Sequence, residues 1–291
     1  MNNRSFSRLI HHLSFRQRWL LPCLSAIVAL TIWATSYAQP ANAQRGLVDL
    51  IFRGIQVIQL SSLSDRQEVT LGGQINQQLL SSEFRLLNEP NITRYVDRIG
   101  QRLVPYSERP NIPYRFQVVR NNQVNAFATM GGYVYVTSGL LAKAANEAEL
   151  ASVLGHEMGH IVGRHAVNQM KQQAIEAGLA SAAGLDRNTA VRIGVELALN
   201  RPGSRRDEFE ADRLGLFSLT RAGYAASAMP AFMQNLVSSR SVPNFLSTHP
   251  ATPDRIRTLN QLIAQNNLAG SAGLDNAAYQ SAVRSRLTSQ R

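Results

Sequence analysis

The sequence predicts one α+β domain over residues 44–291, mainly helical with a small β-sheet. Several segments carry apolar residues at helical spacing and begin at residues that cap helices. Only two short segments, residues 114–120 and 132–137, are rich in β-branched and aromatic residues, as strands are. No internal repeat or long linker divides the 291-residue chain, which is long enough to bury a sizeable core.

The first 43 residues are interpreted as a targeting segment. An apolar run at residues 19–38 follows four arginines, and no acidic residue precedes Asp49. This pattern is typical of a secretory signal peptide, with Ala-Asn-Ala at residues 41–43 as the cleavage site. The run of about 20 residues is also long enough for an uncleaved membrane anchor. Both alternatives place the rest of the chain in the periplasm or cell envelope, because the arginines hold the N-terminus inside.

The charge balance first suggests nucleic-acid binding. The chain carries 30 Lys and Arg against 19 Asp and Glu, a formal charge of +11. Four of these arginines belong to the targeting segment, and the others are scattered without a basic and aromatic cluster. We therefore expect attraction to anionic membrane surfaces or acidic unfolded proteins, and no nucleic-acid partner. The single cysteine, Cys23, excludes an internal disulfide and a Cys-ligated zinc module.

Residues Leu47–Leu60 predict a helix with an unusually broad apolar surface. Its polar side chains Asp49, Arg53 and Gln56 share one face, at positions i, i+4 and i+7. Such a helix packs on its own domain, packs on a second subunit, or lies in a membrane interface. The segment is therefore a candidate for contact with a membrane surface or for a homo-oligomer interface.

Two helices are expected before the first strand. The first covers residues 64–80 and opens with Ser64 and Gln67 as a capping box. The second covers residues 91–104, where apolar side chains recur at helical spacing, and Pro105 ends it.

Three helices are expected after the second strand. A long helix begins at Asn146 and runs through residues 156–165 to about residue 170. Residues 174–203 are too polar and too broken to span a membrane. Another helix covers residues 206–221, and the last begins at Thr252-Pro253, a pairing typical of a helix start.

The long helix carries the motif His156-Glu157-Met158-Gly159-His160. Two His at i and i+4 lie one turn apart on one helix face, so their imidazoles can bind one metal ion. Glu157 lies close enough to contact a water held by that metal, which is the H-E-x-x-H arrangement. The alternative, two His that only satisfy hydrogen bonds on a core helix, is disfavoured by the capped helix and its glycines. Gly155, Gly159 and Gly163 recur every fourth residue and indicate close packing.

A catalytic zinc needs a third protein ligand. His165 is one residue short of a three-His pattern and lies opposite His156 on a continuous helix, so it is assigned a packing or supporting role. A carboxylate from the acidic segment at residues 207–212 is expected instead. Glu208 is favoured because Asp212, one turn later, can accept the Nδ1–H of a ligand His. A solvated acidic helix face remains the alternative for this segment.

These motifs resemble the HtpX-like and CAAX prenyl protease-type zinc metallopeptidases, which are gluzincins. The resemblance covers most of residues 64–260. It rests on motifs in a fixed order, at residues 125–128, 131–141, 147–151, 156–160, 164–165, 204–212 and 248–250. The chain lacks the several membrane spans of HtpX, so its layout is closest to the single-domain periplasmic members of the BepA type. Processing of prenylated proteins is not expected.

The resemblance implies a zincin-like domain with one zinc ion per chain, bound by His156, His160 and Glu208. It implies that Glu157 is the catalytic residue. It also implies that the strand at residues 132–137 borders the active-site cleft, where an extended substrate adds as a further strand. The candidates for this substrate contact are Asn125, Gly132, Tyr133 and Val134.

Asp212 and His249 are expected to support or regulate the metal site. The resemblance places His249 near the metal, either as a reversible fourth ligand that silences the enzyme or as a donor to the transition state. A loop His without a role is the remaining alternative, since no spacing rule fixes His249 here.

The sequence therefore predicts a zinc-dependent metalloendopeptidase that hydrolyses peptide bonds of misfolded or unassembled envelope proteins. The alternative is a zinc-containing chaperone or adaptor of the cell envelope with little proteolysis. The two differ in whether the carboxylate of Glu157 is needed.

Overall fold

The computed structural model describes residues 58–178, 185–200, 204–239, 243–250, 253–284 and 287. The predicted targeting segment and the domain boundary after residue 43 lie outside these residues, and both stay predictions. The predicted helix at Leu47–Leu60 is described only from Ile58, which pairs with Leu185 in an isolated β-bridge (N–O 2.7 Å) and is therefore not helical. In the part of the chain that the structure describes, no helix is both long and apolar enough to cross a membrane.

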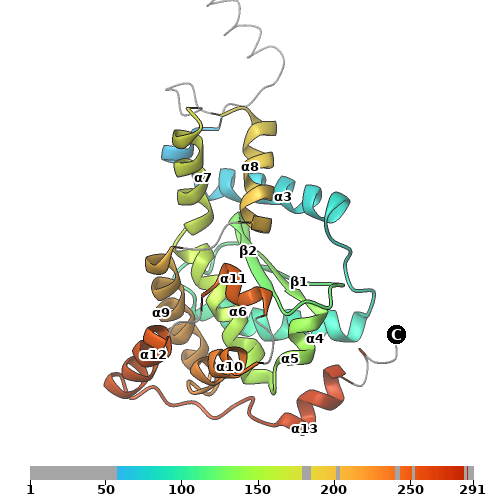
Figure 1. The fold of residues 1–291 in the computed structure, drawn as a ribbon, viewed down its shortest axis with the longest axis vertical. Helices are drawn as coiled ribbons and strands as arrows, with labels where there is room; N and C mark the ends of the chain where they lie inside the picture. The colour runs from blue at the N-terminus through green and yellow to red at the C-terminus, as the bar shows by residue number, and fades with distance from the viewer. Residues whose placement is uncertain are drawn as a thin grey trace, which may run out of the picture. The chain divides into compact units, whose positions relative to one another are not determined.

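A three-stranded sheet lies in the middle of the described residues (Figure 1). Its strands are β1 (Arg115–Val119), β2 (Ala126–Thr129) and β3 (Tyr133–Thr137). The strand order is β1-β3-β2, with β3 parallel to β1 and antiparallel to β2. The strands predicted at residues 114–120 and 132–137 are confirmed. The sequence did not indicate β2, because two of its four residues are alanines with little preference for strands.

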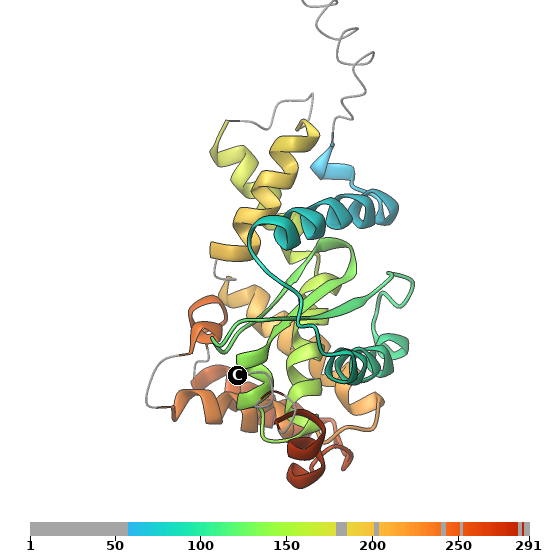
Figure 2. The ribbon, with the colours of Figure 1, turned by 90° about the vertical axis from the view of Figure 1, so that its right-hand side faces the viewer.

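Helices cover both faces of the sheet (Figures 1 and 2). Along β3, Val134 and Val136 point into a core shared with α4 (Pro90–Leu103) and α6 (Glu147–Val162). Tyr135 points the other way, into a second core shared with α3 (Asp65–Ser82), α7 (His165–Glu176) and α8 (Arg187–Asn200). This alternation follows from the two-residue period of a strand. The predicted mainly helical α+β domain is confirmed.

The long helix α6 packs along α9 (Arg205–Arg221), and glycines bring the two backbones together. A Cβ added at Gly159 would lie 2.5 Å from the Ala211 carbonyl oxygen, and one at Gly155 would lie 3.1 Å from the carbonyl oxygen of Gly215. The glycine spacing therefore does indicate close packing. Because of it, the His motif on α6 faces the acidic segment on α9.

The helix predicted from residue 146 to about residue 170 is in fact two helices, which corrects that prediction. α6 ends at Val162, and Arg164 has the left-handed φ of 54° before α7 begins. The Arg164 guanidinium binds the Glu68 carboxylate at 3.2 Å and donates to the Leu63 carbonyl. These contacts from α3 and the segment before it hold the break, which sequence periodicity alone does not reveal.

The other predicted helices are present, with shifts of one or two residues at their ends. Ser64 and Gln67 form the predicted capping box of α3. The remaining elements are α5 (Ser138–Lys143), α10 (Ala228–Val237), α11 (Asn244–Thr248), α12 (Pro253–Gln265), α13 (Asn276–Tyr279), the 3-10 turns Leu60–Ser62, Val104–Tyr106 and Met130–Gly132, and a π-helical turn Gln280–Arg284. Thr252, the predicted cap of α12, lies outside the described residues.

Candidate metal centre

Three His and one Glu converge between α6, α9 and the residue after α11. One atom each of His156, His160, Glu208 and His249 lies within 4.8 Å of all the others. The Nε2 atoms of His156 and His160 are 3.1 Å apart, and each is 3.4 Å from an oxygen of Glu208. The Nδ1 atom of His249 is 3.3 Å from the Nε2 atom of His156 and 3.2 Å from Oε1 of Glu208.

This arrangement fits a zinc ion. Zinc prefers nitrogen and oxygen donors in a tetrahedron with bonds of about 2.0–2.1 Å, which places neighbouring donor atoms about 3.3–3.4 Å apart. Five of the six pairs among these side chains have donor atoms 3.1–3.4 Å apart, when either oxygen of Glu208 is counted, and the four donors all lie within 4.8 Å of one another. Three of the four residues are buried, and His160 is partly buried.

Of the four acidic residues at 207–212, only Glu208 reaches the cluster. Asp207 lies near Gln169 at 3.5 Å, and Glu210, with a side chain 39% exposed, lies near His165. Asp212 stands behind His156, where its Oδ1 is 2.9 Å from Nδ1. The structure therefore places Glu208 and Asp212 as their four-residue spacing suggested.

A buried arginine that the sequence analysis missed supports both carboxylates. Arg255 is 1% exposed, and its guanidinium donates to both oxygens of Asp212 at 2.7 Å and lies 2.8 Å from Oε2 of Glu208. Burial alone would raise the pKa of Asp212, but the hydrogen bonds from Arg255 hold it below its usual value. A signal was available, since Arg255 shares an i, i+4, i+7 stripe on α12 with Leu259 and Leu262.

His165 contacts the second His of the motif. Its Nδ1 atom lies 2.8 Å from Nδ1 of His160, and its Nε2 atom lies 3.5 Å from Oε2 of Glu210. The ring fits there because residue 163 is Gly, where a Cβ would lie 2.4 Å from Nε2 of His165. His165 therefore fixes the orientation of the His160 ring, as Asp212 does for His156.

Replacing His165 with Phe keeps a ring at this position but removes the hydrogen bond to His160. We expect the affinity for zinc to fall about 10–100-fold, as it does when partners of metal-bound His are removed. Competition with a chelator measures this affinity, and exposed Asn168 on the same helix provides the control variant Asn168→Ala. Equal affinity in His165→Phe and the control would show that the contact does not orient the ligand.

Glu157 is buried beside the cluster without a hydrogen bond. It is 0% exposed, and among the described residues neither of its carboxylate oxygens has a hydrogen-bond partner. Nε2 of His249 lies 3.5 Å from its Oε1. Burial raises the pKa of Glu157 because it disfavours the charged form. A carboxylate with a raised pKa and unused lone pairs is suited to accept a proton.

The strand predicted to receive the substrate is not at an edge of the sheet. β3 pairs with β1 on one side and with β2 on the other, so no further strand can add to Tyr133 or Val134. Gly132 lies in the turn before β3, with its Cβ position 2.8 Å from the Ile112 side chain. The sheet has two edge strands, β1 and β2. The outer side of β1 is bridged by Leu86 at Val119, and Asn125 immediately precedes β2. The predicted addition of a substrate strand to β3 is therefore wrong, because both sides of β3 are already paired.

The outer edge of β2 has free backbone groups. The Thr137 N–H donates to the Asn125 carbonyl at 3.0 Å. In an antiparallel pair every second residue is hydrogen-bonded to the partner strand, so the residues of β2 at even distance from Asn125 face β3 and those between them face outward. The N–H and C=O of Ala128 then point away from β3. Within the described residues, no hydrogen bond to either group of Ala128 is formed.

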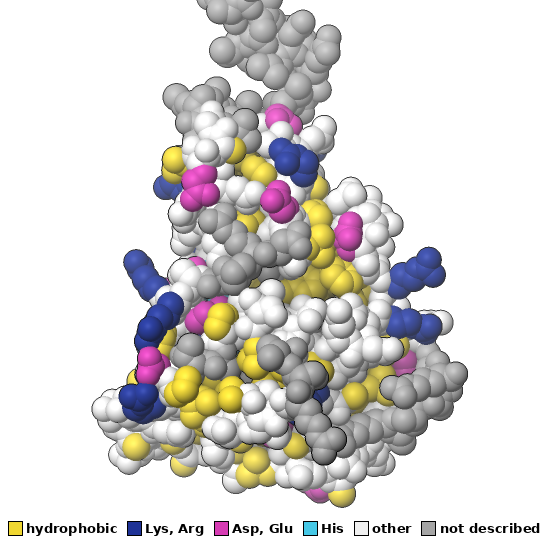
Figure 3. Space-filling view, in the orientation of Figure 1, with side chains coloured by type: hydrophobic (Ala, Val, Ile, Leu, Met, Phe, Trp, Pro, Cys, Tyr) yellow, Lys and Arg dark blue, Asp and Glu magenta, His cyan; other side chains and the backbone are white. Residues whose placement is uncertain are grey.

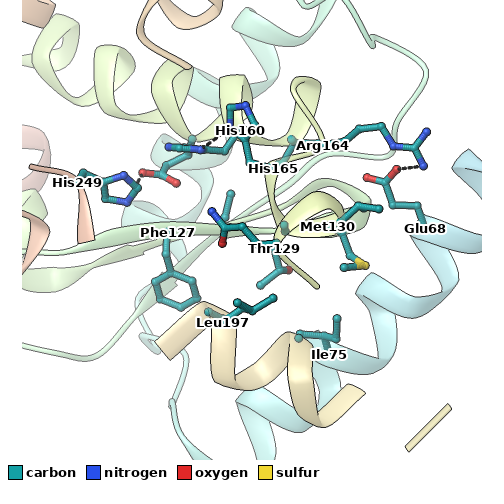
Figure 4. Close-up of a pocket in the computed structure, with 18 residues that line it drawn as sticks. Glu68, Ile75, Phe127, Thr129, Met130, His160, Arg164, His165, Leu197 and His249 are labelled. Atoms are coloured by element: carbon teal, nitrogen blue, oxygen red, sulfur yellow. Dashed lines mark hydrogen bonds and ion pairs between the residues drawn. The ribbon is translucent and has the colours of Figure 1, made fainter. Parts of the chain in front are cut away.

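An apolar pocket opens beside the cluster (Figure 4). Glu157, His160 and His249 form one side of it, and β2, α3, α7 and α8 supply the others. In Figure 4, Phe127, Leu197 and Ile75 lie across the pocket from His160. The surface view shows apolar side chains gathered in a hollow between the α3 layer and the sheet (Figure 3).

Comparison with known proteins finds a family and several relatives for this chain. Residues 90–263 match the family described as peptidase family M48. The beta-barrel assembly-enhancing protease of Escherichia coli (strain K12) is 34% identical over 67% of this chain and 44% of its own length. The mitochondrial metalloendopeptidase OMA1 of Schizosaccharomyces pombe is 29% identical over 60% of this chain and 53% of its own length. OMA1 of Arabidopsis thaliana is 31% identical over 66% of this chain and 39% of its own length. The chain therefore spans about half, or less, of the length of these relatives.

Proposed function

Because the chain belongs to peptidase family M48, we propose that it is a zinc-dependent metalloendopeptidase of misfolded or unassembled envelope proteins. The observation that carries this proposal is the placement of Glu157 beside a cluster of His and Glu donors, where it is buried and has no hydrogen-bond partner among the described residues. His156, His160 and Glu208 would hold the ion. When bound, zinc supplies a Lewis acid that lowers the pKa of a water ligand to about 7 and polarises a peptide carbonyl.

The chain's own groups then carry the proton. Glu157 accepts a proton from the attacking water on its free carboxylate and delivers it to the leaving amine. Asp212 and His165 keep the two His rings in the orientation that turns their Nε2 atoms toward the ion. The outward N–H and C=O of Ala128 on β2 bind the backbone of an extended substrate, which holds the scissile bond against Glu157.

We assign His249 a regulatory role. Its Nδ1 atom supplies a fourth donor to the cluster, whereas a catalytic zinc keeps one position open for water or substrate. Its Nε2 atom also lies 3.5 Å from Oε1 of Glu157, the residue that would accept the proton. This geometry favours the inhibitory alternative for His249 over that of a loop residue without a role.

The names of the relatives support the choice of substrate and location. One relative is named for enhancing the assembly of beta-barrels, and this name supports unassembled envelope proteins as the substrates. The signal-like segment at residues 1–43 supports export to the periplasm or envelope. Cleavage of unfolded casein by the purified chain tests the activity itself. We expect a chelator to abolish cleavage and added zinc to restore it, while cleavage that persists in the chelator would contradict the proposal.

The identity of the third ligand has its own test. Replacing Glu208 with Ala removes one of three donors, so we expect the zinc content of the dialysed protein to fall from one per chain to well below it. Replacing Glu210 with Ala is the matched control, because Glu210 lies two residues away and outside the cluster. Metal analysis after dialysis measures both. An unchanged zinc content in Glu208→Ala would show that another carboxylate of the segment at residues 207–212 is the third ligand.

A further inference from the structure

We propose that Glu68, a residue outside the metal cluster, is a positioning residue for the metal ligand His160. Its carboxylate acts through Arg164 and His165, which together set the orientation of the His160 ring. This inference rests on the proposed function, because it concerns the zinc affinity of the same centre. It goes beyond that function because Glu68 lies on α3, which contributes no donor to the cluster and precedes the residues that match family M48.

Glu68 is a buried carboxylate that binds two arginines. It is 0% exposed, and its Oε2 atom lies 2.9 Å from Nη2 of Arg109 and 3.2 Å from Nη2 of Arg164. Its Oε1 atom accepts from Nη1 of Arg109 at 3.3 Å, so this guanidinium holds both oxygens. A buried carboxylate is costly unless it is paired and hydrogen-bonded, so Glu68 keeps both arginines in place.

Both arginines act on the end of α6. Nη1 of Arg109 donates to the Ile161 carbonyl at 2.8 Å, in the last turn, where helix carbonyls lack intrahelical partners. Arg164 has the left-handed φ of 54°, which is unfavourable for a residue with a Cβ and persists only where its surroundings hold it. Its ion pair with Glu68 is such a contact, and Figure 4 marks it with a dashed line. Glu68 therefore holds the break between α6 and α7 from both sides.

The break decides where His165 lies. Helix α7 begins at His165, directly after Arg164, and Nδ1 of His165 lies 2.8 Å from Nδ1 of His160. A His160 that binds a metal through Nε2 carries its proton on Nδ1, which then donates to His165. On a continuous helix, residues five positions apart point to different sides. The contact that orients His160 therefore exists only while the break is held.

Replacing Glu68 with Gln tests the charge at nearly constant size. A neutral amide binds guanidinium groups more weakly than a carboxylate does, and its NH2 group is a donor that they cannot accept from. The break is then held less firmly, so we expect the affinity for zinc to fall by at least about 10-fold. The control is Glu149→Gln, a buried glutamate that binds at the start of α6, and it should stay within about 2-fold of the wild type.

Competition with a chelator measures the zinc affinity of the full chain as wild type, Glu68→Gln, His165→Phe and the double variant. Because Glu68 acts through His165, its substitution should change the affinity by less than about 2-fold once residue 165 is Phe. Cobalt(II) bound in the same centre gives a second readout, because its visible absorption depends on the geometry of its ligands. We expect the cobalt spectrum to change in Glu68→Gln and to stay as in the wild type in Glu149→Gln. A loss of stability alone moves neither readout while the protein is folded.

The outcomes separate this inference from the proposed function. A fall in zinc affinity no larger than that of the control, or an unchanged cobalt spectrum, overturns the inference and leaves the peptidase intact. An equal fall with and without His165 also overturns it, because Glu68 would then support the centre by another route. A wild type that binds no zinc overturns the proposed function and this inference with it.

A second variant covers the case in which Glu68→Gln is unfolded at the assay temperature, as thermal unfolding would show. Arg109→Lys then takes its place in the same comparison. It keeps the positive charge beside Glu68 but lacks the guanidinium that bridges this carboxylate and the Ile161 carbonyl. The same fall in zinc affinity, again lost once residue 165 is Phe, is expected, and a fall no larger than that of Glu149→Gln overturns the inference.

Discussion

Replacing Glu157 with Gln is expected to lower the rate of peptide hydrolysis about 10²–10⁴-fold and to leave the zinc content near one per chain. The amide has the size of the carboxylate but cannot accept a proton at neutral pH. Glu157 is fully buried, and among the described residues no hydrogen bond holds it in place, so the substitution breaks no hydrogen bond to the rings of His156 and His160. It also removes a buried charge, so the variant should be as stable as the wild type or more stable.

Casein cleavage, zinc analysis and thermal unfolding together measure this prediction. Glu149→Gln is the matched control, because Glu149 is also a buried glutamate on α6 but lies at the helix start, where its carboxylate accepts from the Ala145 N–H. The control should lose stability and keep its activity per folded molecule. Full activity in Glu157→Gln would contradict the mechanism. A wild type that prevents aggregation without cleaving, and a variant that does so equally well, would favour the chaperone or adaptor.

The sequence could predict those parts of the site that lie on one helix. His156, Glu157 and His160 keep their spacing in any α-helix, so their common face follows from the 3.6-residue period alone. The capped start of α6 and the glycine stripe were equally local signals. Glu208 and its partner Asp212 followed from a spacing of one turn on a second helix, and the packing of α6 on α9 brings that pair to the His residues.

The parts that the sequence could not predict depend on contacts between distant segments. The break between α6 and α7 is held by the pair of Arg164 with Glu68, which are 96 positions apart in the sequence. The strand order, with β3 in the centre of the sheet, is one of these parts. A central strand and an edge strand can have the same alternation of apolar and polar residues, so the sequence pattern of β3 does not reveal its position. The contact of His165 with His160 depends on the same break between α6 and α7. On a continuous helix His165 would point away from the metal site, so the sequence did not predict this contact.

Replacing Arg255 with Met is expected to lower the free energy of unfolding by about 3–5 kcal/mol. Methionine has a similar volume and is apolar, so the loss comes from the electrostatics and not from a cavity. Without the guanidinium, the carboxylates of Asp212 and Glu208 remain buried at 2% and 1% exposure. Two charges of the same sign in a site of low polarity then lack their common counter-ion.

Denaturant unfolding of the metal-free protein measures this loss. Arg257→Met is the matched control, because Arg257 lies two residues away on α12 with a side chain that is 64% exposed and pairs only with Asp254 among the described residues. An exposed pair of this kind contributes about 0–1 kcal/mol. A difference of less than about 1 kcal/mol between the two variants would contradict the supporting role of Arg255.

The loss of stability in Arg255→Met should depend on pH in a direction that the pKa of Asp212 fixes. In the wild type, Arg255 keeps the pKa of Asp212 below its value in the unfolded chain, so this pair stabilises the fold at neutral pH and the stabilisation is lost as the pH falls through the folded pKa. In Arg255→Met, the guanidinium no longer opposes burial, so the pKa of Asp212 rises above its value in the wild type, while the contact of Asp212 with Nδ1 of His156 remains. The destabilisation relative to the wild type is then largest near neutral pH and shrinks as the pH falls, and it disappears only once the carboxyl group of the folded wild type is protonated as well. The double variant Arg255→Met with Asp212→Asn should therefore cost less than the sum of the two single variants, by more than about 1 kcal/mol, because the second substitution removes the charge that the first leaves unpaired.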